Sequence, residues 1–404
     1  MRFESDLLHQ LPDEPPARSS VDIHGAIRSG RRRKAVRRGG YAATGAAVAI
    51  AAGGLLVLPR ASAPAEVAGP TAAPTSCEVQ VLPLPDGVRS AVVNGSDSSG
   101  RYLAGRTEPA ADPILWQNGL PRKLDFPGDG RSTLTDVNTG GTAVGWGFTA
   151  DTDRNPVPYV YRQGVPTPLP APAGGRALAI NDAGVIAGES DGTAVRWPSS
   201  TASPVSLPVP DDTKTSLVVG IDDDGTVIGH ADWRTFVWRP DGTRIELPPQ
   251  TIDGSPATIT MPNDISNGRA LVTAATTDQK SASFLWTLTT NTVERITEPT
   301  AQPGKPSSQA GASTPQPGDS TLQAGALTAT GWTVATDTTR NLPVLITGRF
   351  AGSSATGPTL PLPLPEGGMP YAGPLYRVDD NARSIIGHII DSTSAVRPIL
   401  WTCR

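Results

Sequence analysis

Short apolar stretches and polar turns alternate along most of the chain, and one order of residues returns several times. Residues 180–197 read INDAGVIAGESDGTAVRW, and residues 221–238 read IDDDGTVIGHADWRTFVW. The same order appears at 137–161 and at 378–401. Each copy has an apolar pair, a polar turn with Gly, a short Val/Ile run and a strand that ends in an aromatic residue. A period of this length, built from short strands, is typical of a β-propeller.

The third copy predicts four strands, A to D, at 176–180, 185–189, 193–197 and 204–208. Asp/Asn-x-Gly between strands A and B favours a tight turn. The residue that ends strand C can be found seven times along the chain, at Trp116, Tyr161, Trp197, Trp238, Trp286, Ile346 and Trp401. The sequence therefore predicts an all-β fold with seven blades. Six blades are the alternative, because the sixth copy lacks both the acidic turn and the aromatic residue.

The ends of the chain predict how the ring closes. The chain ends three residues after Trp401, so the last blade lacks its own strand D. Residues 77–87, CEVQVLPLPDG, have the strand D pattern but precede the first blade. We therefore expect residues 78–84 to pair beside residues 396–402. That pairing removes the two exposed sheet edges that an open stack of blades would leave.

The chain has two cysteines, Cys77 and Cys403, in its first and last predicted strands. If the first strand completes the last blade, the two residues lie on adjacent strands. In an oxidising compartment they are expected to form a disulfide bond. Two free thiols are the alternative.

An uncharged apolar run at 41–58 follows a cluster of seven basic residues between Arg28 and Arg38. Eighteen residues of helix span roughly 27 Å, just enough for a bilayer. Because Lys and Arg stay in the cytoplasm, the pattern predicts a single transmembrane helix with the N-terminus inside. A cleaved signal peptide is the alternative, since Ala61-Ser62-Ala63 has the form of a cleavage site. Both place residues 64–404 outside the cell.

Composition divides the chain into four parts: a basic head at 1–40, the apolar run, a Pro/Ala linker at 59–76 and the propeller at 77–404. Within the propeller, residues 299–321 are rich in Pro, Ser, Gln and Gly, which predicts a disordered insert. The head holds nine Lys/Arg and five Asp/Glu, a net +4 within a chain of net −4. The rest is therefore acidic, which excludes a nucleic-acid-binding footprint.

Two resemblances follow from these motifs. The unit I-N-D-x-G-x-x-x-G, followed by an aromatic-ended strand, resembles the HAF-type extracellular repeat of bacterial secreted proteins over about three hundred residues. The His-Ala-Phe signature itself is absent, and its nearest echo is Arg234-Thr235-Phe236. This resemblance implies a propeller without a defined activity. Residues 5–38 look like the cytoplasmic head of actinobacterial single-pass, anti-sigma-like proteins, although no cysteine precedes Cys77 to build their zinc motif.

Motifs for catalysis or metal binding are weak in this sequence. The one G-x-S-x-G, at 188–192, spans the end of a predicted strand B and the turn after it, and two of the four histidines, His9 and His24, fall in the predicted cytoplasmic head. Asp222-Asp223-Asp224 and Asp379-Asp380-Asn381 could suggest Ca²⁺, but both stretches fall on the A–B turn, where Asp and Asn are favoured for turn geometry alone. We therefore predict a protein that is not an enzyme and has no metal or cofactor.

One ring of side chains is predicted to line a mouth of the central channel. It contains the residues that follow the small residue of strand B, and its ligand-binding candidates are Arg106, Trp146, Glu189, His230 and His388. The mixture of charge, aromatic rings and imidazole suits a polar ligand or peptide. The alternative is that these are ordinary strand-end residues.

Trp146 and Trp233 fall outside the repeated tryptophan position, and the charged loop 151–154 is expected beside them.

These observations predict a membrane-anchored extracellular propeller that recognises a protein, a peptide or a cell-wall glycan without catalysis. A second hypothesis is a transmembrane regulator whose head, residues 1–40, binds a cytoplasmic partner such as a sigma factor. A third is a glycan hydrolase or lyase, which would need two carboxylates facing the channel.

Overall fold

The computed structural model describes residues 72–127, 131–149, 155–171, 174–297, 322–347, 354–355, 359–371 and 376–404. The predictions for residues 1–58, for most of the linker, for the loop 151–154 and for the insert at 299–321 lie outside the described residues. Within the described ranges, no helix has the length and hydrophobicity needed to cross a bilayer.

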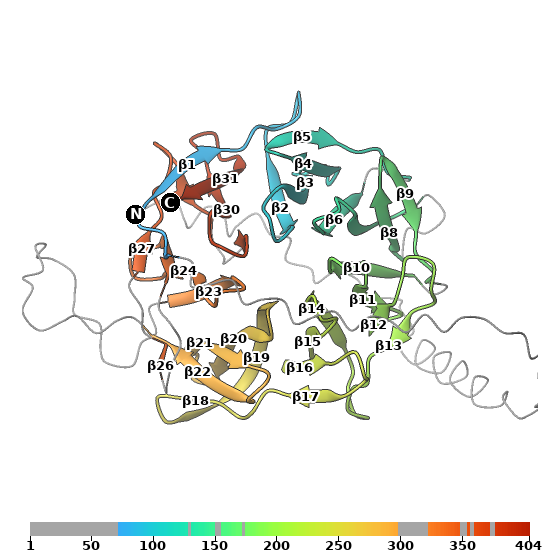
Figure 1. Cartoon of the computed structure of the whole chain (residues 1–404), viewed down its shortest axis with the longest axis vertical. Helices are drawn as coiled ribbons and strands as arrows, with labels where there is room; N and C mark the ends of the chain where they lie inside the picture. The colour runs from blue at the N-terminus through green and yellow to red at the C-terminus, as the bar shows by residue number, and fades with distance from the viewer. Residues whose placement is uncertain are drawn as a thin grey trace, which may run out of the picture. The chain divides into compact units, whose positions relative to one another are not determined.

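Seven antiparallel sheets follow one another round a ring, and strand A of each lies nearest the centre (Figure 1). Blade 1 contains β2 (Ala91–Ser96), β3 (Tyr102–Thr107), β4 (Pro113–Gln117) and β5 (Leu120–Lys123). Blade 2 contains β6 (Ser132–Val137), β7 (Ala143–Gly147), β8 (Val157–Arg162) and β9 (Val165–Pro168). Blade 3 contains β10 (Gly175–Ile180), β11 (Ile186–Ser190), β12 (Thr193–Trp197) and β13 (Val205–Ser206). The strands of the third blade lie within a residue or two of their predicted places.

Blades 4 and 6 have the same four-stranded plan, and blade 5 has extra edge strands. Blade 4 contains β14 (Ser216–Ile221), β15 (Val227–Ala231), β16 (Arg234–Trp238) and β17 (Arg244–Glu246). Blade 5 contains β19 (Ser255–Ser266), β20 (Arg269–Thr276), β21 (Ser281–Thr287) and β22 (Thr292–Ile296), with β18 (Thr251–Ile252) and β26 (Ser354–Ala355) added at its edges. Blade 6 contains β23 (Leu322–Leu327), β24 (Thr333–Asp337), β25 (Leu342–Ile346) and β27 (Thr359–Pro361). Seven blades are confirmed, including the weak sixth copy.

Blade 7 joins the two ends of the described chain. Its sheet contains β28 (Met369–Pro370), β29 (Arg377–Val378), β30 (Ser384–Ile390), β31 (Val396–Cys403) and β1 (Cys77–Val81). β1 pairs antiparallel with β31, with Cys77 opposite Cys403 and Val81 opposite Ile399. Cys77 and Cys403 form a disulfide bond, with their Cα atoms 4.0 Å apart. The predicted closure and the predicted disulfide are therefore both confirmed.

The repeated tryptophan fixes four of the blades to the blade before them. Trp197 is fully buried and its indole N–H donates to the carbonyl of Pro170, which follows strand D of blade 2, at 2.9 Å. Leu169, just before that proline, packs in the same core cluster as Trp197. The same indole-to-proline bond recurs at other blade junctions, from Trp116 to Pro83, from Trp238 to Pro208 and from Trp401 to Pro363. The Leu-Pro pair at the end of strand D is thus part of the repeat.

A close approach explains the glycine that ends the Val/Ile run of strand B. A Cβ atom on Gly188 would lie 2.0 Å from the carbonyl oxygen of Arg176 in strand A, and Gly105, Gly145 and Gly229 show the same contact within 2.2 Å. Blades 5 and 6 carry Val272 and Ala335 at this position. The close approach therefore belongs to blades 1 to 4.

We expect Gly188→Ala to lower the free energy of unfolding by about 3 kcal/mol, because the new methyl group meets backbone rather than a movable side chain. Gly192→Ala is the matched control, since Gly192 has open space around it and a φ of +70°. It should cost only about 1 kcal/mol of conformational strain. Urea denaturation of both variants measures the difference. Equal losses would show that the close approach does not determine this position.

Candidate functional site

The central channel widens into a cavity of about 210 Å³ at the end of the ring where strands A turn into strands B. Its wall comes from the strands A and the A–B turns of blades 1 to 7. It carries one cation, Arg377, and seven carboxylates, from Asp97, Asp136, Asp182, Asp222, Asp223, Asp264 and Asp380. The cavity is therefore strongly acidic.

A β-bulge at the same place in six strands A shapes this wall. The pairing of strand A with strand B shifts between Leu134 and Asp136 in blade 2, and between equivalent residues in blades 1, 3, 4, 5 and 6. The residue after the bulge occupies one register position, at Gly95, Asp136, Ala179, Gly220, Asp264, Ala326 and, in blade 7, Arg377. We call this set the inner ring. Three of its seven members are charged.

The charged members of the inner ring connect neighbouring blades. Asp136 accepts hydrogen bonds from the backbone N–H of Val137 and of Ile180 in blade 3, both at 2.9 Å. Asp264 accepts from the backbone N–H of Ile265 and Leu327 in the same way, and so connects blade 5 to blade 6. Arg377 donates to the carbonyl of Asn94 and connects blade 7 to blade 1.

Burial within the narrow channel raises the pKa of Asp136 to about 7 and that of Asp264 to about 6. The backbone hydrogen bonds and the charge of Arg377 lower both values but do not offset the loss of solvent. Both residues are half-buried, and desolvation dominates because the cavity wall surrounds their carboxylates. Since each carboxylate oxygen already accepts a backbone N–H, we assign these two residues a connecting role.

Asp380 differs from the other carboxylates at the mouth. Burial raises its pKa to about 6, and the charges of Asp223, Asp379, Asp182 and Asp222 raise it further. Its backbone N–H donates to the carbonyl of Ser98, but among the described residues no hydrogen bond reaches its carboxylate. By contrast, the oxygens of Asp222 accept from Asn267 and Gly268. Asp380 is therefore a carboxylate held near like charges without a donor.

Asp380→Asn is expected to raise the melting temperature at pH 8 and to leave it unchanged near pH 3. The pKa of this carboxyl is higher in the folded state than its ordinary value of 3.8, so folding disfavours the ionised form. That cost is absent below about pH 3, where both states hold the proton, grows between the two pKa values and is fully present above about pH 6. Asp241→Asn is the opposite-sign control, because a backbone hydrogen bond from Thr243 lowers the pKa of Asp241. A fall in melting temperature for Asp380→Asn at pH 8 would contradict this assignment.

The five residues predicted as ligand-binding do not line this cavity. They lie near the other end of the channel, where strand B ends, and strand A stands between strand B and the central space. Trp146 and Glu189 come together through Arg176, whose guanidinium lies 4.9 Å from the Trp146 ring centroid and 2.8 Å from a Glu189 oxygen. Arg106 pairs with Glu108 at 2.8 Å. Arg106, Trp146 and Glu189 thus have partners within the protein, and a ligand-binding role for them stays a prediction.

The two histidines of the predicted ring have different surroundings. His230 stacks on Trp233, and burial lowers the pKa of its imidazole. His388 is only 6% exposed, and its Nε2 accepts the backbone N–H of Val93 in blade 1 at 2.8 Å. The expectation that His388 faces an open mouth is therefore wrong, because its ring packs between blades 7 and 1. Since Nε2 accepts a hydrogen bond there, this arrangement requires the neutral imidazole.

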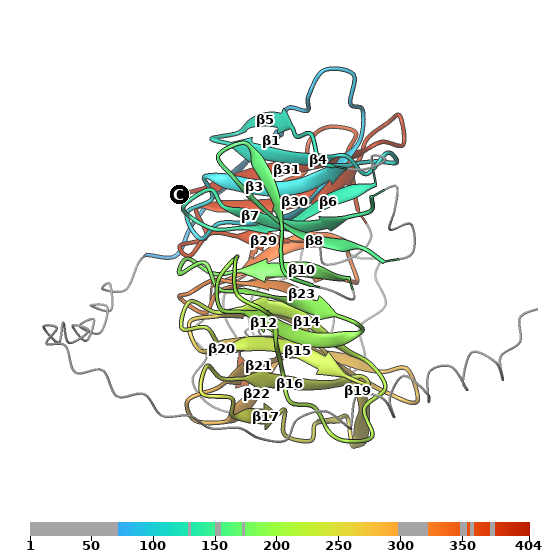
Figure 2. The same ribbon diagram turned by 90° about the vertical axis from the view of Figure 1, so that its right-hand side faces the viewer.

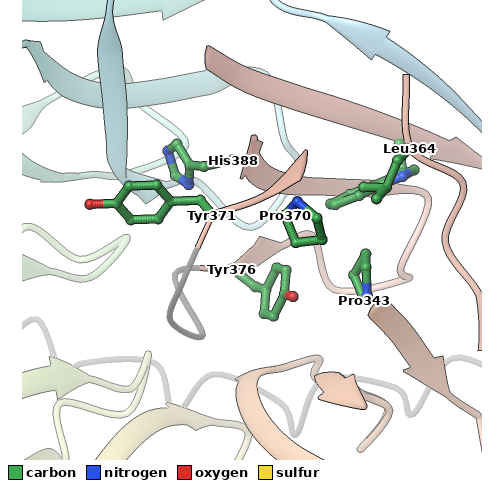
Figure 3. Close-up of a pocket in the computed structure, with 7 residues that line it drawn as sticks. Pro343, Leu364, Pro370, Tyr371, Tyr376 and His388 are labelled. Carbon is green, nitrogen blue, oxygen red and sulfur yellow. The ribbon is translucent and has the colours of Figure 1, made fainter. Parts of the chain in front are cut away.

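A small cavity of about 10 Å³, room for about one water molecule, lies beside His388. Figure 3 shows Tyr371 and His388 on one side of Pro370, Pro343 and Leu364 on the other, and Tyr376 below it. The Tyr376 hydroxyl lies 2.8 Å from that of Thr336 in blade 6. This space is too small for a ligand and serves the junction between blades.

Asp136, Asp264 and Arg377 were missed by sequence reasoning, although a signal was present. Each is a charged residue near the end of a strand A, followed by one apolar residue, Val137, Ile265 or Val378, before the turn. Asp222 and Asp379 do have the turn role expected of them, because their carboxylates accept backbone N–H groups of their own turns, from Asp223 and Arg383. Within the described ranges, no group of three or more His, Cys, Asp and Glu side chains is placed to hold a metal ion.

No family model matches this chain, and no curated protein matches it in sequence. Solved structures do match in fold. A streptogramin B lyase is 12% identical, with 81% of this chain and 98% of that chain covered and a TM-score of 0.51. YCF48 from Cyanidioschyzon merolae is 10% identical, with coverage of 81% and 98% and a TM-score of 0.47. An oligogalacturonate lyase in complex with manganese is 11% identical, with coverage of 83% and 96% and a TM-score of 0.47. At these identities, what this chain shares with the streptogramin B lyase structure is the β-propeller fold.

Proposed function

We propose that this protein is a cell-surface recognition protein, held in the membrane by residues 41–58 with its basic head inside the cell. The positive charges before the apolar run support that orientation. The Cys77–Cys403 bond supports it independently, because structural disulfides persist in oxidising compartments. The propeller is the part that meets a ligand.

The ligand that best fits the acidic cavity is a cationic side chain, Lys or Arg, from a polypeptide partner. A mouth with seven carboxylates and one guanidinium attracts positive charge. The observation that carries this proposal is the Asp380 carboxylate, which has like charges around it and no donor among the described residues. A bound ammonium or guanidinium group would supply both the hydrogen bond and the opposite charge.

Titration of a tetralysine peptide into the full chain tests this function. We expect binding that weakens as salt rises, because the attraction is screened, and that strengthens between pH 5 and pH 7 as Asp380 ionises. Asp380→Asn should lose at least tenfold in affinity while gaining stability. Asp241→Asn is the control for loss of one negative charge elsewhere. Equal affinity for Asp380→Asn and the unchanged protein would overturn the proposal.

A glycan-cleaving enzyme is the second candidate, favoured by one observation. Asp136 has a pKa raised to about 7 in a channel that also holds other carboxylates, and a protonated carboxyl beside an ionised one is the acid–base pair of glycosidases. Its two oxygens, however, are occupied by backbone N–H groups. Release of new reducing ends or unsaturated ends from cell-wall polysaccharides, lost in Asp136→Asn, would favour the enzyme over recognition.

A further inference from the structure

Arg377 is the one cation among the described residues that line the acidic cavity, and two backbone carbonyls hold its side chain in place. Its Nε–H donates to the carbonyl of Asn94 in blade 1 at 2.5 Å, and its Nη1 donates to the carbonyl of Tyr376 at 2.7 Å. Its Nη2 makes no hydrogen bond to a described residue. Because a guanidinium group has five N–H donors in a planar fork, the outer end of Arg377 can still donate.

The two carboxylates that share the inner ring with Arg377 are already occupied. Asp136 and Asp264 each accept two backbone N–H groups. The charge of Arg377 lowers the pKa of both carboxyl groups, yet within the described part of the chain no ion pair joins Arg377 to either of them. Burial still raises the pKa of Asp136 to about 7, so this carboxyl is partly protonated at neutral pH. The positive charge of Arg377 is therefore only partly compensated.

The inner ring is lined by small residues around these charged groups. Its uncharged members, from blades 1, 3, 4 and 6, are Gly95, Ala179, Gly220 and Ala326. No side chain larger than a methyl group projects from these positions. The cavity that remains, about 210 Å³, is smaller than the roughly 300–1,000 Å³ of pockets for drug-sized ligands. It suits a single amino-acid residue rather than a loop of a partner.

Asp380 and Arg377 form two unlike poles on one blade. Asp380 is a carboxylate without a hydrogen-bond donor among the described residues, and Arg377 is a donor without a carboxylate. The strands run from one face of the ring to the other (Figure 2), so Asp380, on the A–B turn, lies nearer the mouth than Arg377 in β29. Three residues of extended chain span at most about 10 Å. One ligand residue that has both a cation and a carboxylate can therefore reach both poles.

We propose that the cavity binds the C-terminal residue of a polypeptide that ends in Lys or Arg, with the side-chain cation at Asp380 and the free α-carboxylate at Arg377. This inference rests on the proposed function and narrows it from any basic side chain to one at a chain end. A guanidinium fork matches the two oxygens of a carboxylate. The α-carboxylate enters first, and the long basic side chain points back toward the mouth. An internal Lys or Arg has no carboxylate to offer Arg377.

Two synthetic peptides that differ only at their C-terminus test the inference. One is Gly-Ser-Gly-Lys with a free carboxylate, and the other is the same peptide with a C-terminal amide. Isothermal titration calorimetry on the full chain in detergent micelles measures both affinities. We expect the peptide with the free carboxylate to bind at least tenfold more tightly. Attraction to an acidic cavity alone predicts the opposite order, because the amide has one more positive net charge.

Three variants assign the effect to its residues. Arg377→Gln should abolish the preference for the free carboxylate. Arg122→Gln should keep that preference, and it is the matched control for loss of one positive charge, since Arg122 is exposed on the outer strand β5. Asp380→Asn should weaken both peptides at least tenfold and leave their order unchanged.

The outcomes separate this inference from the proposed function. An amide that binds the unchanged protein as tightly as the free carboxylate overturns the inference, and the proposed function stands if Asp380→Asn weakens both peptides. A folded Arg377→Gln that keeps the preference also overturns the inference. Undiminished binding of both peptides to Asp380→Asn, or no binding of either to the unchanged protein, overturns both proposals. Because Arg377 also connects blade 7 to blade 1, the peptide comparison on the unchanged protein decides the matter if Arg377→Gln does not fold.

Discussion

Replacing Cys77 or Cys403 by Ser is expected to lower the free energy of unfolding by about 5 kcal/mol in non-reducing buffer. The bond joins residues 326 positions apart, and the entropy that a cross-link removes from the unfolded chain grows with loop length. In the folded state the same bond holds β1 against β31, which is the pairing that closes the ring. Guanidinium denaturation followed by circular dichroism measures the loss, and the β-sheet signal should remain before the transition.

Two controls make this prediction specific to the bond. The double variant Cys77→Ser/Cys403→Ser should match either single variant, because each single change already removes the cross-link. In a strong reducing agent the unchanged protein should lose its advantage. A single variant as stable as the unchanged protein would show that the strand pairing alone closes the ring.

Trp197→Ala is expected to lower the free energy of unfolding by about 4 kcal/mol, since it empties a fully buried site at a blade junction. It also leaves the carbonyl of Pro170 without its donor. Trp197→Phe separates the two contributions, because it keeps most of the apolar ring and removes the indole N–H. That variant should lose about 1 to 2 kcal/mol.

Trp233→Ala is the matched control for this second prediction. Its ring is exposed, so the loss of buried area is small. The same urea titration applied to the three variants should give the order Trp197→Ala, Trp197→Phe, Trp233→Ala from most to least destabilised. A Trp197→Phe variant as damaged as Trp197→Ala would assign the junction to the hydrogen bond rather than to packing.

The fold was readable from the sequence because most blades repeat one local arrangement. The tight A–B turn, the glycine at the close approach of strands A and B, and the buried aromatic residue at the end of strand C are short-range features. Each leaves a residue type at a fixed spacing. Closure of the ring is a long-range feature, yet it could be predicted, because one strand D was missing at the end of the chain and an extra one preceded the first blade.

The site was harder to predict, for a geometrical reason. The residues that follow the small residue of strand B, such as His388, were expected to face the channel. The innermost strand A covers them, and His388 accepts a hydrogen bond from Val93 of the next blade. The cavity wall is made by the residues next to a β-bulge and by the A–B turns. A bulge reverses which side chains face inward, and periodicity does not show where it occurs. Asp380 was interpreted as a turn residue. It is distinguished by the carboxylates around it and by the absence, among the described residues, of a hydrogen-bond donor to its own carboxylate. Both features arise only where several blades meet.

We propose that the closed propeller acts outside the cell on a membrane anchor. Protease treatment of intact cells tests this proposal most directly. The full chain would carry an epitope tag before residue 1 and an antibody would detect the propeller. We predict that added protease cuts in the Pro/Ala linker at 59–76, removes the propeller from the cells and leaves a protected tagged fragment of the first forty residues and the apolar run. A propeller that stays intact until the cells are lysed would contradict the account.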